Sequence, residues 1–287
     1  MGALVLQLSP ALIFGVLYAR RARTLRDHGR PVPGWRVACW YSGLAIIVAV
    51  LVSPLASLAE ERFSAHMAEH LLIADIGALL LVLGLTGPLL APLLRNPLLG
   101  PLRHLAHPVP ALLLWAIDLA IWHLPGPHEA AVRHDAVHAL QHVLFIGFGV
   151  NMWMALLGPL PKPAWFGNLG RLGYIVAVRL FGTVLANVFV WADHPIYDVY
   201  EGGATDQIVA GSIMMVEGSI LTLALGCWLF LRAASQAEER QDLLELADER
   251  GVPLDERRAA RAVAAGRGDE LRRRLEAARG AGGGPSS

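Results

Sequence analysis

The sequence Arg133-His-Asp-Ala-Val-His-Ala-Leu-Gln-His142 leads directly into an apolar run that begins at Val143. On an α-helix His134, His138 and His142 fall at positions i, i+4 and i+8, so their side chains form one stripe. Imidazoles at the end of an apolar helix are costly to place in a membrane and are usually functional. The pattern therefore predicts a membrane helix that carries a histidine ladder at one end.

A second apolar run opens in the same way, with His66-Met-Ala-Glu-His70. Two histidines at i and i+4 project from one helical face and are able to share a metal ion. A single pair of this kind is a weak signal. Two ladders on separate helices favour a metal or cofactor site over histidines that only make structural hydrogen bonds, although that alternative stays open.

The composition places the chain in a membrane. Of its 287 residues 55% are hydrophobic and 17% are charged, and most of the charge follows Arg232. Runs of about 20 apolar residues match a hydrocarbon layer about 30 Å thick. We therefore expect an all-α, polytopic membrane protein, with a transmembrane domain at 1–232 and a charged tail at 233–287. Two cysteines are too few for a disulfide framework.

About seven transmembrane helices are expected. The first apolar run has no basic residue before it and a cluster of arginines after it, which indicates a retained span whose N-terminus lies outside. Loops assigned to the outside carry only Arg62 and Arg133 as basic residues, whereas those assigned to the cytoplasm carry most of the arginines. The tail is then cytoplasmic, helical at 236–250 and 254–279, and flexible at 280–287. The expected spans are 4–18, 37–58, 66–90, 109–124, 138–157, 173–192 and 207–231.

This topology gathers most of the histidines at the outer end of the bundle. Imidazole suits copper, zinc, iron and nickel, and an added thioether favours Cu(I). Acidic or amide side chains beside the ladders are candidates to orient the ligands, namely Glu69, Asp135 and Gln141. The candidate metal ligands are His66, Met67, His70, His123, His134, His138, His142 and His194.

Polar side chains also occur deeper in the spans. Charged groups inside a membrane are expensive and usually face the bundle interior in pairs, so Arg179 is expected to pair with Asp118 or Asp75. A relay or ion pathway is the alternative. Asn187, Trp191 and His194 share one helical face, which would direct a polar stripe toward the outer cavity. The deep polar residues are Asp75, Asp118, Asn151, Arg179, Asn187 and Glu217, and all but Asn151 are candidates for an orienting or relay role.

Three motifs resemble the bacterial cytochrome c oxidase assembly factors of the CtaG family. They are the His66–His70 motif continuing to Leu83-Gly-Leu-Thr-Gly-Pro88, the His134–His142 motif, and Asp206-Gln-Ile-Val-Ala-Gly-Ser-Ile-Met214. The resemblance covers 1–232 and excludes the tail. One departure is Met215, where the family usually has an aromatic residue.

The resemblance implies a seven-helix, multi-pass protein of the bacterial plasma membrane that matures cytochrome c oxidase by handling copper. Its partners would be oxidase subunits, other copper chaperones and the lipid bilayer, with no nucleic acid. The family's histidine positions correspond to the two ladders, and Asp206 and Gln207 match its last-helix signature.

Three functions remain open from the sequence. The first is a non-enzymatic carrier that holds Cu(I) transiently and passes it to the oxidase. The second is an intramembrane hydrolase with zinc-bound water and a carboxylate base, which Glu69, Asp75 or Glu217 would supply. The third is a haem protein with axial histidines from facing helices, which leaves the surplus histidines unexplained.

Overall fold

A computed structural model describes residues 2–278, with side chains from residue 9 onward. The described chain contains helices and no strands, which confirms the predicted all-α class. The chain divides into two compact units, Met1–Thr222 and Leu223–Ser287, which are described separately.

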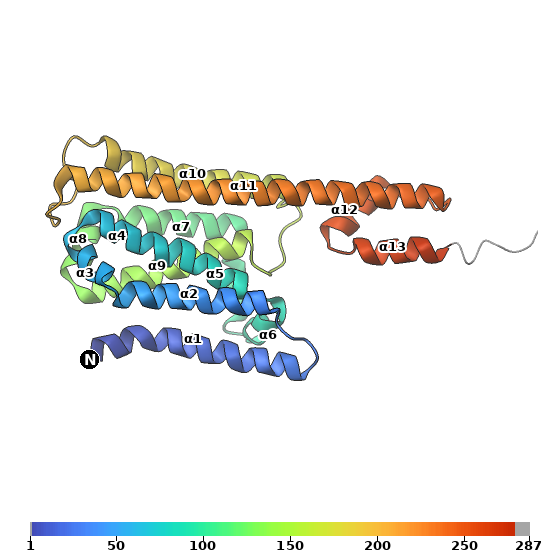
Figure 1. Ribbon diagram of the computed structural model, residues 1–287, viewed down its shortest axis with the longest axis horizontal. Coiled ribbons are helices and arrows are strands. Elements are labelled where there is room, and N and C mark those ends of the chain that lie inside the picture. The colour runs from blue at the N-terminus through green and yellow to red at the C-terminus, as the bar shows by residue number, and fades with distance from the viewer. Residues whose placement is uncertain (1, 279–287) are drawn as a thin grey trace, which may run out of the picture. The chain divides into compact units, whose positions relative to one another are not determined.

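The first unit is built from long apolar helices (Figure 1). In chain order its elements are α1 (Gly2–Asp27), α2 (Gly34–Val52), α3 (Pro54–Glu61), α4 (Phe63–His70), the π-helical segment η1 (Leu71–Gly77), α5 (Ala78–Gly84), α6 (Gly87–Arg95), the 3₁₀ segment η2 (Gly100–His104), α7 (Pro108–Trp122), α8 (Pro125–Arg133), α9 (Asp135–Leu156) and α10 (Asn168–Trp191). Helix α11 (Gly203–Glu249) begins in this unit.

Five helical segments within the described residues are long and apolar enough to cross a membrane: α2, the run from α4 to α5, α9, α10 and α11. Helices α7 and α8 meet at a bend of 71° and give a sixth if they count as one span. The chain is thus a polytopic membrane protein with five or six such spans. The expected first span falls within α1, which is not among them, and a count of seven with the N-terminus outside stays a prediction.

Glycine and proline end the third expected span before residue 90. Helix α5 stops at Gly84, and α6 restarts at Gly87 with Pro88 in its first turn. Proline lacks an amide hydrogen and fits the first helical turn, where that hydrogen has no intrahelical partner. The expected single span at 66–90 is therefore a helix that ends at Gly84 and a separate short helix.

The run from α4 through η1 to α5 packs against α2 and α9. Glycines allow these helices to approach backbone to backbone. A Cβ added to Gly84 would lie 2.7 Å from the Trp40 Cβ on α2. One added to Gly149 on α9 would lie 2.3 Å from the carbonyl oxygen of Ala74 in η1. Small residues at such contacts are typical of membrane helices, and here they bring α9 close to the helix that carries His66 and His70.

The second unit has a small apolar core of its own. Leu243 on the last part of α11 packs with Val263 of α12 (Glu256–Ala264) and Leu275 of α13 (Gly268–Ala277). The predicted helix at 254–279 is interrupted between α12 and α13, where Gly266 has φ +66°. That left-handed conformation is readily adopted only by glycine. The segment 280–287, predicted to be flexible, lies outside the described residues.

We expect Gly149→Ala to destabilise the protein and Gly147→Ala to leave its stability unchanged. A methyl group at position 149 meets the η1 backbone, and overpacking of this kind costs about 1–3 kcal/mol. A Cβ at Gly147, on the same helix, meets no atom within 4 Å among the described residues. Thermal unfolding of the two variants in detergent measures the difference, and equal unfolding temperatures would contradict the glycine contact.

Candidate metal centre

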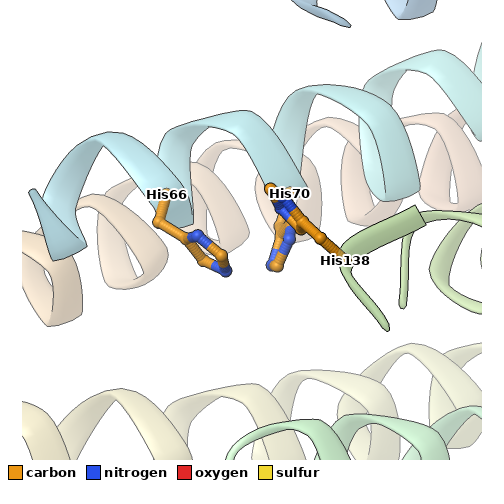
Figure 2. Close-up of side chains that lie close together, drawn as sticks. All are labelled: His66, His70 and His138. Carbon is orange, nitrogen blue, oxygen red and sulfur yellow. The ribbon is translucent and has the colours of Figure 1, made fainter. Parts of the chain in front are cut away.

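Two histidine pairs face each other across α4 and α9. The ring centroids of His66 and His70 lie 4.2 Å apart on α4, and those of His138 and His142 lie 4.2 Å apart on α9. Between the helices, His66 and His138 are stacked at 5.3 Å, and His70 and His142 lie 5.4 Å apart. Figure 2 shows the rings of His66, His70 and His138 converging from these two helices. The structure thus brings four of the predicted ligands into one cluster.

Donor atoms in the cluster form two sets of three. One atom each from His66, His70 and His138 lie within 4.8 Å of one another, and so do one atom each from Glu69, His138 and His142. Metal–imidazole bonds of about 2.0 Å place three donors about 3.5 Å apart, so small side-chain rotations suffice to close either set around an ion.

The nitrogens in this cluster are buried without protein partners. The exposed fraction is 0% for His66 and 6% for His70, and both ring nitrogens of each lack a hydrogen-bond partner within residues 2–278. The Nε2 atoms of His138 and His142 are equally unpaired among the described residues. A buried polar atom left unpaired costs about 1–3 kcal/mol, so such atoms usually have a bound water, an ion or another ligand as partner. Unpaired imidazole nitrogens on converging rings fit a bound transition-metal ion.

Two further polar side chains border the rings. Glu69 is 1% exposed, and its Oε1 lies 3.7 Å from Nε2 of His142. Gln141 is also buried, and neither atom of its amide has a partner in the described part of the chain. Both residues had been predicted to orient ligands. The structure places Glu69 close enough to be a ligand itself.

A layer of aromatic and histidine side chains covers the cluster, and the sequence did not predict it. His128 on α8 is fully buried 4.8 Å from the His66 ring and stacks on Tyr197 at 4.0 Å. Its Nδ1 donates to the carbonyl oxygen of Trp122 at 3.3 Å, so its Nε2 accepts from the Tyr200 hydroxyl at 2.8 Å. Burial raises the pKa of the Tyr200 phenol, which keeps this hydroxyl protonated and able to donate.

His123 lies at the edge of this layer. Its Nδ1 donates to the carbonyl oxygen of Leu119 at 2.7 Å, and its buried Nε2 has no partner in the described chain. Its ring lies 6.4 Å from that of His128, and it belongs to neither set of three donors.

Three of the predicted ligands lie elsewhere. His134 is exposed and extended at the residue before α9, and His194 is exposed in the loop after α10. Met67 is buried in an apolar cluster with Phe63 and Phe189, where its side chain serves packing. Asp135, a predicted orienting residue, is exposed at the start of α9.

Asp206 and Gln207 have structural contacts beside the site. The Asp206 carboxylate accepts from the Ser64 amide at 3.2 Å and from the Ser64 hydroxyl. Gln207 accepts from the Ile196 amide at 2.7 Å and donates to the Phe189 carbonyl oxygen at 3.1 Å. These bonds tie the start of α11 to the start of α4 and to the loop that carries Tyr197 and Tyr200.

The deeper polar residues do not pair as predicted. Arg179 donates to the Met215 carbonyl oxygen and the Ser219 hydroxyl, each at 3.0 Å, and makes no ion pair with a carboxylate among residues 2–278. Gly218 leaves room for its guanidinium, since a Cβ there would lie 2.1 Å from it. The pairing of Arg179 with Asp118 or Asp75 is therefore wrong. Backbone and hydroxyl groups of α11 satisfy the cation instead.

The predicted polar stripe on α10 does not reach the metal centre. Asn187 donates to the Thr183 carbonyl oxygen at 2.8 Å and accepts from the Trp191 indole at 3.0 Å, both within the same helix. Trp191 is 77% exposed. Of the other deep candidates, Asp118 is buried on α7, Asp75 is half-buried on η1, and Glu217 lines a groove of α11 together with Ile76.

Comparisons with known proteins agree with the resemblance seen in the motifs. Uncharacterized proteins of Mycobacterium bovis and Mycobacterium tuberculosis are each 27% identical over 186 residues, which is 59% of this chain, and one of Mycobacterium leprae is 26% identical over 187 residues. The chain matches only 28% of the length of these relatives. No solved structure matches it. The profile of the family described as cytochrome c oxidase caa3 assembly factor matches residues 16–236, and the chain belongs to that family.

Proposed function

We propose that this chain assists the assembly of cytochrome c oxidase by binding copper as cargo between α4 and α9 and passing it to an oxidase subunit. The observation that carries the proposal is the cluster of buried imidazole nitrogens without protein partners. Membership of the assembly-factor family is the reason for proposing the oxidase as the recipient of the copper. We place the protein in the bacterial plasma membrane with the cluster on its outer side, in keeping with the arginine-rich loops at the opposite ends of the helices.

The donor set favours copper held for release. Imidazole binds copper well, whereas thiolates, which hold Cu(I) more firmly, are absent from both donor sets. Met67 packs with Phe63 and Phe189, so the proposal does not use its sulfur. A carrier needs a site that is closed to water yet able to exchange ligands with its client, and three neutral imidazoles in a buried site meet both needs.

A zinc-dependent hydrolase is the second candidate, and the position of Glu69 favours it. A buried carboxylate beside two imidazoles resembles the metal-and-base arrangement that activates water. Protein purified from cells supplied with both metals distinguishes the candidates. Stoichiometric zinc, together with hydrolysis lost in Glu69→Gln, would replace the copper carrier. A haem between α4 and α9 is disfavoured, because His66 and His138 stack directly on each other and leave no space for a macrocycle.

Removal of ligands from both donor sets should abolish tight copper binding. We expect His138→Ala and the double variant His70→Ala/His142→Ala each to weaken Cu(I) binding at least about 100-fold, since loss of a residue that only orients a ligand already costs about 10–100-fold. Competition with a chromophoric chelator under reducing conditions measures the affinity. His104→Ala, at an exposed histidine of η2, is the matched control and should bind as the wild type does. Unchanged affinity in both cluster variants would overturn the copper site.

Loss of the same residues should impair the oxidase in cells. In a host that lacks this gene, the wild-type chain and His104→Ala should restore assembled, active oxidase, whereas His138→Ala and the double variant His70→Ala/His142→Ala should not. Added copper should rescue these two variants in part, because mass action then replaces delivery. Oxidase activity and the copper content of the purified oxidase are the measurements. Full activity in the cluster variants, at expression equal to the wild type, would contradict a role of this site in assembly.

A further inference from the structure

The two sets of donors in the metal centre have one member in common, His138. The first set has three imidazoles, from His66, His70 and His138, and the second has the carboxylate of Glu69 with the imidazoles of His138 and His142. His142 lies four residues beyond His138 on α9, which is about one helical turn. The second set is therefore displaced along α9 from the first.

Residues of both sets are buried and have polar atoms without hydrogen-bond partners in the described chain. His66, His70 and Glu69 are each more than nine-tenths buried, and each has at least one polar atom with no hydrogen-bond partner within the described chain. His142 completes the second set, with a side chain that is 12% exposed and an Nε2 that is likewise unpaired there. The Glu69–His142 separation of 3.7 Å is too long for a hydrogen bond, so the carboxylate does not satisfy this nitrogen.

The shared histidine limits how the two sets can be filled. A neutral imidazole carries a hydrogen on one nitrogen and a lone pair on the other, so it binds one metal ion at a time. Simultaneous occupation of both sets would require His138 to lose its second proton and bridge two cations in a buried site. A single ion that moves between the sets needs only an exchange of ligands around His138.

We infer that these two donor sets form a two-position track for one copper ion. His138 stays bound in both positions, while His66 and His70 are exchanged for Glu69 and His142. The two positions differ in chemistry. The all-imidazole position suits Cu(I) or Cu(II), and the position with a carboxylate suits the divalent ion better. The inference rests on the proposed function only for the choice of copper as the ion.

The track predicts that substitutions at the two sets weaken copper binding to different extents, which a single site does not predict. If two positions share the ion, removal of one leaves the other, and the affinity falls by about twofold to tenfold. We therefore expect modest losses in Glu69→Gln and His66→Ala, and a loss of at least about 100-fold in His138→Ala. Glu69→Gln keeps the size of the side chain, so it tests the track even if His66→Ala folds poorly. Glu61→Gln, at an exposed carboxylate of α3, is the matched control.

Electron paramagnetic resonance of the full chain in detergent, loaded with one equivalent of Cu(II), distinguishes the positions. We expect one ion per chain in every binding variant. Glu69→Gln should shift the spectrum to an all-nitrogen environment, and His66→Ala should shift it to one with oxygen, whereas Glu61→Gln should match the wild type. A wild-type spectrum unchanged by Glu69→Gln, or two ions bound per chain, would overturn the track while leaving the copper carrier in place. A wild type that binds neither Cu(I) nor Cu(II) would overturn the proposed function itself.

Discussion

The main constraint on the structure is the burial of imidazole rings whose nitrogens have no hydrogen-bond partner in the described protein. Each unpaired nitrogen costs about 1–3 kcal/mol, and the cluster of α4 and α9 contains several. Such an arrangement persists only if the surrounding packing is rigid enough to prevent the rings from rotating toward water. The close contact of Gly149 with the η1 backbone provides that rigidity, because it sets α9 against the helix of His66 and His70 with little freedom to separate.

A second group of contacts closes the site at the His66 end of the cluster. Asp206 binds the backbone and side chain of Ser64 at the start of α4, and Gln207 holds the loop before α11 through the Ile196 amide. That loop carries Tyr200, whose hydroxyl donates to His128 above the His66 ring. Segments far apart in the sequence are thus linked through buried hydrogen bonds to the first turn of the helix that carries His66 and His70. The Asp-Gln motif of the last helix acts on the site through the backbone it positions.

The sequence predicted what depends on local periodicity and missed what depends on tertiary contacts. The i, i+4 spacing placed His66 with His70 and His138 with His142, and all four meet in the cluster. The same rule failed at His134, because α9 begins at Asp135 and the backbone before it is extended. His128 was expected near the cluster but not as a ligand or orienting residue, since its position arises from the 71° bend that folds α8 back and buries it. Arg179 was misassigned because its hydrogen bonds go to carbonyl and hydroxyl groups of a neighbouring helix, and no residue pattern shows this.

The donor atoms of the cluster suit transient binding of an ion better than permanent binding. A site built for retention would add thiolate ligands, and the described cysteines, Cys39 and Cys227, lie outside both donor sets. In the proposed carrier, exclusion of water would prevent loss of the ion to solvent, while neutral nitrogen ligands would hold copper less firmly than thiolates and so would let one imidazole be exchanged for another. A carboxylate at one end of the cluster makes that exchange asymmetric, because its charge favours the ion more strongly than an imidazole does where the surroundings are apolar. Burial and moderate ligand strength together therefore suit a protein that moves an ion along its own side chains better than one that stores it.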